Sequence, residues 1–212
     1  MQWTLVVPVK TLARAKSRLA DTADDGMRPV LALAFAQDTV AAALACPAVA
    51  DVAVVTDDAR AGRELAGLGA RVVADEPGDG LNAALAHGAA AVRAARPRSA
   101  VAALNADLPA LRPAELTRVL TAATQFRRAF LSDAAGIGTT LLAAAPGQEL
   151  LPAFGPDSRV RHRASGAVEL LLGTVDSVRQ DVDTGADLRT ALALGVGPRT
   201  AAVAARLLIA GQ

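Results

Sequence analysis

The sequence predicts an α/β protein with a single-domain, doubly wound and mostly parallel sheet. Short apolar runs rich in valine recur along the chain, and alanine- and leucine-rich segments of helical length separate them. Because these runs are continuous rather than alternating, each strand is expected to be buried on both faces, as in a parallel sheet covered by helices. No linker or repeat interrupts the 212 residues, so one domain over residues 1–212 is expected.

Strands and helices are expected to alternate through the first half of the chain. The expected strands there are residues 4–9, 51–56, 70–75 and 99–104. The expected helices are residues 27–45, a short segment after residue 56, and a segment from Asn82 onward. The second half is less regular, with strands at 128–133 and 138–144, a loop entering a helix within 155–166, and a strand running into a capped helix over 174–188.

Composition excludes several classes of protein. Twenty-two basic and 21 acidic residues give a net charge of +1, which is not the charge of a nucleic-acid binder. The single cysteine excludes an internal disulfide, and the two histidines lack zinc-ligand spacing, so any metal is expected to have oxygen ligands. No signal peptide or membrane-length apolar segment is evident, which predicts a cytoplasmic protein without a membrane partner.

A basic cluster follows the first expected strand. Lys10, Arg14, Lys16 and Arg18 lie within nine residues, at the sheet edge where doubly wound proteins bind ligands. These side chains either clamp a triphosphate or form the exposed face of a helix, since Arg14 and Arg18 are four residues apart. The chain has neither the P-loop motif nor the glycine pattern of dinucleotide-binding folds.

A glycine-rich turn follows the third expected strand in "EPGDGLNAAL". Gly78 and Gly80 would let the backbone approach a ligand at the start of a helix, where N–H groups are free. The alternative is an ordinary Pro-Gly turn in which Asn82 caps the helix. Spacing leaves both interpretations open.

Asp107, in "LNADLP", ends the fourth expected strand. A carboxylate there either binds a hard cation such as Mg²⁺ or caps the turn before Pro109. A second acid could come from Asp181 or Asp183 in "QDVDTGADL". We expect these two to point to opposite faces of an extended segment, so that only one of them meets Asp107 easily. Asp187 is assigned to the first turn of the following helix.

A second ligand site is expected in the segments "GIGTTLLAA" and "FGPDSRVRHRASG". They offer hydroxyls, flexible backbone and positive charge for a small anionic acceptor. The alternative is a solvent-exposed basic loop, and both histidines are interpreted as structural or surface residues rather than ligands. The candidates are Thr139, Thr140, Gly155, Ser158, Arg159, Arg161, His162, Arg163, Ser165 and Gly166.

Taken in order, the segments "VVPVKTLARAKSRL", "VVTDD", "EPGDGLNAAL", "LNADLPAL", "GIGTTLLAA", "FGPDSRVRHRASGA" and "DVDTGADL" resemble the small guanylyltransferases that build coenzyme F-420. The resemblance covers nearly the whole chain. It implies the nucleotide-diphospho-sugar transferase fold and transfer of GMP from GTP, with pyrophosphate release. The acceptor in that family is phosphoenolpyruvate or 2-phospho-L-lactate, and no residue pattern here chooses between them.

The resemblance also implies roles for particular residues. Asp107 matches the Mg²⁺-binding aspartate, with Asp183 favoured over Asp181 as the second ligand. The remaining matches are Lys10, Lys16 and Arg18 for the GTP phosphates, Gly80, Leu81 and Asn82 for the nucleoside, and Thr139, Gly155 and Ser158 for phosphoenolpyruvate. The glycine-rich L-x-G-G-x-G-T-R-like loop of broader nucleotidyltransferases is missing, and the guanine preference rests on the resemblance alone.

Three other functions stay open at the level of sequence. They are a nucleotidyltransferase for another acceptor, such as a molybdopterin or a sugar phosphate, a non-catalytic nucleotide-binding protein, and a dinucleotide-dependent enzyme. Self-association and a downstream transferase of the same pathway are further open partners.

Overall fold

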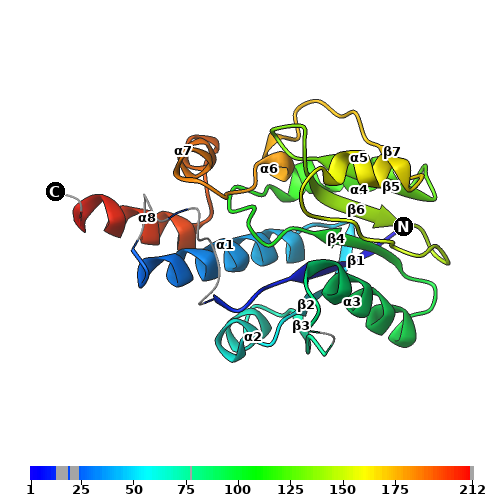
Figure 1. The fold of residues 1–212 in the computed structure, drawn as a ribbon, viewed down its shortest axis with the longest axis horizontal. Coiled ribbons are helices and arrows are strands. Elements are labelled where there is room, and N and C mark those ends of the chain that lie inside the picture. The colour runs from blue at the N-terminus through cyan, green and yellow to red at the C-terminus, as the bar shows by residue number, and fades with distance from the viewer. Residues whose placement is uncertain (13–18, 20–23, 77, 211–212) are drawn as a thin grey trace.

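The computed structural model describes residues 1–12, 19, 24–76 and 78–210, so Arg14, Lys16 and Arg18 of the basic cluster lie outside the described residues (Figure 1). Its described strands form one sheet in the order β3-β2-β1-β4-β6-β5-β7. The strands are β1 (Trp3–Pro8), β2 (Val49–Val55), β3 (Arg71–Val73), β4 (Ala100–Leu104), β5 (Arg128–Ser132), β6 (Thr139–Ala144) and β7 (Val168–Glu169).

The sheet is mostly parallel, as the continuous apolar runs predict. Strands β1 to β4 are parallel to one another, and β7 is parallel to β5. Only β6 reverses direction among the described strands, because it pairs antiparallel with both β4 and β5. The expected α/β class with a doubly wound sheet is confirmed.

The helices largely follow the predicted segments. They are α1 (Met27–Leu44), α2 (Ala59–Ala66), α3 (Leu81–Ala95), α4 (Pro113–Ala123), α5 (Ser158–Ala164), α6 (Asp176–Arg179), α7 (Gly185–Leu194) and α8 (Pro198–Ala210). Helices α4 and α8 and the two-residue strand β7 were not expected from the sequence. The strand expected at the start of 174–188 is wrong, since the short helix α6 lies there. The capped helix that follows is confirmed, with Thr184 and Asp187 forming a capping box at the start of α7.

Helices cover both faces of the sheet (Figure 1). Leu5 and Val7 of β1 are buried with residues of α1, α2 and α4, whereas Val6 is buried with residues of α3. This alternation along a fully buried strand produces two apolar layers, one on each side. Among the described helices, none combines the length and apolar character that a membrane span requires.

Helix α3 approaches the sheet closely at Gly88. A Cβ placed there would lie 2.6 Å from methyl groups of both Val6 and Val55. These β-branched side chains are stiff, so they cannot move aside without disturbing β1 and β2. Gly88 is therefore required by packing.

We expect Gly88→Ala to lower the free energy of unfolding relative to a matched glycine-to-alanine change in another helix. The control is Gly62→Ala in α2, where the new Cβ would lie at an ordinary 3.6 Å from Val72. Both changes gain about 1 kcal/mol of helix propensity, but overpacking costs Gly88→Ala about 1–3 kcal/mol. Urea unfolding of both variants measures the difference, and equal stabilities would contradict the close approach.

The last two helices are tied to α1 and to the loop that follows β4. Figure 1 shows α8 lying alongside α1. The buried carboxylate of Asp38 accepts hydrogen bonds from the backbone N–H groups of Arg199 at 3.2 Å and Thr200 at 2.7 Å. The Gly197 N–H donates to the Pro109 carbonyl at 2.9 Å, so the start of α8 also holds the Asp107 loop.

Candidate active site

A cavity lies at the carboxyl ends of the central strands. Strand β1 has β2 on one side and β4 on the other, so the order in which strands are added to the sheet reverses there, where doubly wound proteins bind ligands. The cavity measures about 670 Å³, which suits a nucleotide-sized ligand. The predicted site residues that line it are Lys10, Leu81, Asp107, Thr139, Gly155, Ser158, Asp181 and Asp183.

Among the aspartates that line this cavity, Asp107, Asp181 and Asp183 come from two loops that lie together. The Val182 N–H donates to the Asp107 carbonyl at 3.0 Å, which holds the segment containing Asp181 and Asp183 against the loop after β4. Val182 itself is fully buried. The expectation that Asp181 and Asp183 point to opposite faces is therefore wrong. They are two positions apart, on either side of a residue whose side chain enters the core, so both reach the cavity.

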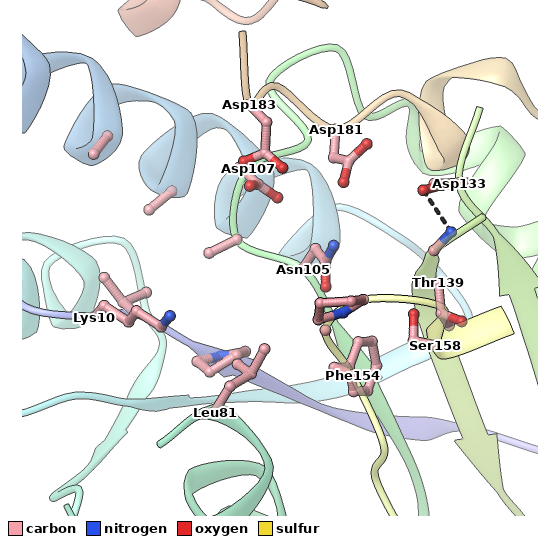
Figure 2. A pocket seen from close by; sticks show the side chains of 18 of the residues that line it. Lys10, Leu81, Asn105, Asp107, Asp133, Thr139, Phe154, Ser158, Asp181 and Asp183 are labelled. Carbon is pink, nitrogen blue, oxygen red and sulfur yellow. Dashed lines mark hydrogen bonds between the residues drawn. The ribbon is translucent and has the colours of Figure 1, made fainter. Parts of the chain in front are cut away.

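These carboxylates suit a hard divalent cation. Asp107, Asp181 and Asp183 line the same cavity, and in the view of Figure 2 the Asp107 and Asp183 side chains overlap while Asp181 lies to one side. Within the described residues, no three histidine, cysteine, aspartate or glutamate side chains are close enough to hold a metal ion by themselves. A pair of carboxylates that leaves coordination positions to phosphate oxygens and water is the arrangement that Mg²⁺ prefers.

Thr139, at the start of β6, is oriented by a buried histidine. His162 has no exposed surface, and its Nε2 accepts a hydrogen bond from the Ala153 N–H at 2.9 Å. The neutral ring therefore carries its proton on Nδ1, which lies 2.9 Å from the Thr139 Oγ1. Since Nδ1–H donates to that oxygen, the Thr139 hydroxyl proton remains available to a ligand.

The histidine is neutral at physiological pH. Burial lowers the pKa of His162 to about 4, and the positive charges of Arg128 and Arg161 add to that effect. The interpretation of His162 as a structural residue is confirmed, and its contact with Thr139 was not foreseen from the sequence.

The acceptor loop, residues 150–157, brings Gly155 and Ser158 to the same cavity. Gly155 has φ +112°, a conformation that favours glycine, and its carbonyl accepts a hydrogen bond from the Ser158 N–H at 3.1 Å. Ser158 then begins α5 with its side chain buried, and it lies near Thr139 in Figure 2. The two candidate hydroxyls thus face one ligand position.

The basic residues of α5 do not join them. Arg159 and Arg163 both pair with Glu169, the former at 2.8 Å, while Arg161 bonds to backbone carbonyls of its own loop. None of these arginines lines the cavity, so the expectation that they supply charge to the acceptor site is wrong. The remaining candidates that do not line it are Thr140, His162, Ser165 and Gly166.

The start of α3 differs from both sequence interpretations of Asn82. Gly80 is the N-cap residue, and no side chain caps the helix. The Asn82 amide instead donates to the Phe154 carbonyl at 3.1 Å and accepts from the Phe154 N–H at 2.8 Å. Asn82 lines neither this cavity nor the neighbouring one, whereas Leu81 lines both, and its observed role is to fix the acceptor loop.

Asp133 is a cavity residue that the sequence reasoning missed. Its carboxylate accepts hydrogen bonds from the N–H groups of Ile137 at 2.9 Å and Gly138 at 2.8 Å, which closes the turn before β6 (Figure 2). An aspartate followed by two nearby glycines is a turn signal that could have identified it.

Comparison with known proteins identifies the family. Residues 17–180 match the model of the MobA-like NTP transferase domain. A Streptomyces coelicolor phosphoenolpyruvate guanylyltransferase is 89% identical over the full length of both chains.

Solved structures agree in fold. A nucleotidyl transferase from Methanothermobacter is 26% identical, with a TM-score of 0.63 over 91% of this chain and 97% of that one. A Mycobacterium tuberculosis protein in complex with manganese is 23% identical, with a TM-score of 0.55 over 91% of this chain and 99% of that one. The chain therefore belongs to the MobA-like NTP transferase domain family and, within it, to the phosphoenolpyruvate guanylyltransferases.

Proposed function

We propose that the protein, as one domain over residues 1–212, transfers GMP from GTP to phosphoenolpyruvate and releases pyrophosphate. The observation that carries the proposal is the convergence of Asp107 and Asp183 with Thr139 and Ser158 on one cavity, in a chain 89% identical to a phosphoenolpyruvate guanylyltransferase. The product would be enolpyruvyl-diphosphoguanosine, for coenzyme F-420 biosynthesis. The alternative acceptor is 2-phospho-L-lactate, which would give the lactyl product.

The reaction is an in-line displacement. A phosphate oxygen of the acceptor attacks the α-phosphorus of GTP, a new O–P bond forms, and the bond to the bridging oxygen of the β-phosphate breaks. The attacking oxygen is already anionic near neutral pH, so no general base is required. This agrees with a described cavity lining that contains no histidine.

The chain's own groups position the reactants and offset their charge. Asp107 and Asp183 would hold Mg²⁺, with Asp181 as the alternative second ligand, and Mg²⁺ when bound would neutralise phosphate charge. The carboxylate pair supports a divalent ion, and the manganese complex of the Mycobacterium tuberculosis protein is a precedent on the same fold.

The substrates would lie on either side of these acids. Lys10 lines the cavity and would contact the GTP phosphates together with Lys16 and Arg18. On the other side, Thr139, Gly155 and Ser158 would hold the acceptor phosphate, with the Thr139 hydroxyl donating to it. The backbone at Gly80 and Leu81 would approach the nucleoside.

Pyrophosphate release tests the proposal. Mg²⁺ and GTP are supplied with phosphoenolpyruvate, with 2-phospho-L-lactate, or with no acceptor, and the products are identified by mass spectrometry. A guanylylated acceptor is expected in one of the first two reactions only, which also identifies the substrate. If folded protein releases no pyrophosphate with either acceptor, the proposal is contradicted. A panel containing a molybdopterin and sugar phosphates would then find another acceptor, or leave nucleotide binding without transfer.

The proposal includes a cytoplasmic location and a downstream transferase that consumes the product. The one cysteine, Cys46, is a free thiol, which fits a reducing compartment.

A further inference from the structure

Asn105 is a cavity residue to which the proposed function gives no role. It directly follows β4 and lines the same cavity as Asp107, Thr139 and Ser158. An asparagine side chain carries a carbonyl acceptor and an NH₂ group with two donors, and it has no charge. Among the described residues, none forms a hydrogen bond with the Asn105 side chain, so its amide is available to a ligand.

The backbone places Asn105 between the two halves of the site. Its N–H donates to the Thr140 carbonyl at 3.0 Å, directly beside Thr139, and Asp107 follows only two positions later. In the view of Figure 2 the Asn105 side chain lies between Asp107 on one side and Thr139 and Ser158 on the other. The amide therefore lies between the proposed metal ligands and the proposed acceptor hydroxyls.

The loop that carries this amide is also held by distant parts of the chain. The Asp107 carbonyl accepts a hydrogen bond from the Val182 N–H at 3.0 Å. One residue further on, the Leu108 N–H donates to the buried Thr39 hydroxyl, also at 3.0 Å. A donor on a loop fixed in this way needs no reorganisation when the reaction occurs.

We propose that the Asn105 amide donates a hydrogen bond to a non-bridging oxygen of the α-phosphate of GTP during its transfer. This inference rests on the proposed function. There, the attacking oxygen belongs to a phosphate held by Thr139 and Ser158, while the α-phosphate lies beside the metal-ligand aspartates. The new O–P bond therefore forms between them, where Asn105 lies.

The contact belongs to the transition state more than to bound GTP. As the new O–P bond forms, the bond to the bridging oxygen breaks, its electron pair leaves with pyrophosphate, and Asn105 gives up no proton. The non-bridging oxygens of the five-coordinate phosphorus lie in the plane between the attacking and leaving oxygens. A fixed donor directed at that plane raises kcat. A neutral donor suits this position, because a lysine would pair with the neighbouring carboxylates.

The test compares guanylyl transfer by Asn105→Ala with transfer by the native protein. We expect kcat to fall by about 100-fold, with the KM values of GTP and of the acceptor little changed, because the lost contact forms in the transition state. Gln125→Ala is the control, since it removes an exposed amide that lines neither described cavity and should keep the native kcat. Thermal melting should show that both variants fold.

Sulfur substitution in GTP locates the contact. In the two diastereomers of GTP with sulfur on the α-phosphate, sulfur replaces one or the other non-bridging oxygen, and it accepts hydrogen bonds more weakly than oxygen. In Asn105→Ala, the rate penalty for sulfur at the oxygen that faces Asn105 should shrink, while the penalty at the other oxygen should stay. Unchanged penalties for both diastereomers would overturn the proposal.

Asn105→Asp separates a phosphate contact from a metal contact. The carboxylate has the same size as the amide but repels the α-phosphate, so transfer should fall below that of Asn105→Ala. An Asn105→Asp enzyme that keeps the native rate and needs less Mg²⁺ would make residue 105 a metal ligand and contradict the proposal. Native protein that transfers no GMP refutes the proposed function itself, whereas native transfer with unaltered Asn105→Ala kinetics refutes this inference alone.

Discussion

Asp107→Asn is expected to reduce the rate of guanylyl transfer by about 10³-fold. The neutral amide no longer holds a divalent cation beside the reacting phosphates, so their negative charge is no longer neutralised. The fold should survive, since the carboxylate faces the cavity and the backbone carbonyl, not the side chain, accepts the bond from Val182. Pyrophosphate release across a range of Mg²⁺ concentrations measures the loss, and thermal melting monitors the fold. A folded Asp107→Asn enzyme that stays active and responds normally to metal would remove Asp107 from the site.

The second metal ligand is decided by a matched pair of variants. Asp183→Asn should approach the Asp107→Asn loss, because Asp183 is the proposed second metal ligand, whereas Asp181→Asn should lose only about tenfold. Both variants keep the size of the side chain and the bond from Val182. The reverse order of losses would assign the second position to Asp181.

Acid is expected to destabilise the protein through His162. The ring titrates near 6.5 in the unfolded chain but at about 4 in the folded one, so between these values the unfolded state binds a proton that the folded state does not. The stabilisation is therefore complete above pH 6.5 and is lost progressively as the pH falls toward 4. The total loss is roughly 3 kcal/mol.

His162→Gln isolates this contribution from the carboxylates that titrate in the same range. Glutamine can still form hydrogen bonds with Thr139 and Ala153 but does not titrate. The variant should therefore be less stable than the native protein at pH 7. Its free energy of unfolding should also change less with pH between 6.5 and 4. Urea unfolding at several pH values measures both slopes. Parallel pH profiles for the two proteins would show that His162 does not carry the loss.

Features encoded locally were predictable from the sequence. The strand runs, the long first helix and the capping box at Thr184 depend on residues within a few positions of one another, and each is present. Asp107 was identifiable because a charged residue directly after a buried strand is uncommon without a partner.

Features that depend on distant partners were not predictable. The segment of α6 became helical rather than extended where the buried Glu115, 62 positions earlier in the chain, accepts bonds from the Ser177 N–H and hydroxyl. Asn82 has a strong local signature of a helix cap, yet its amide is held by Phe154, 72 positions later. In α5, the count of arginines suggested an anion site because their partner, Glu169, was not apparent from the motif.

Because α8 is attached to α1 and to the loop after β4, residues 197–210 belong to the folded domain. Asp38 and Pro109 accept bonds from residues 197–200, so a carboxypeptidase or an early stop codon that removes this stretch also loosens the neighbourhood of Asp107.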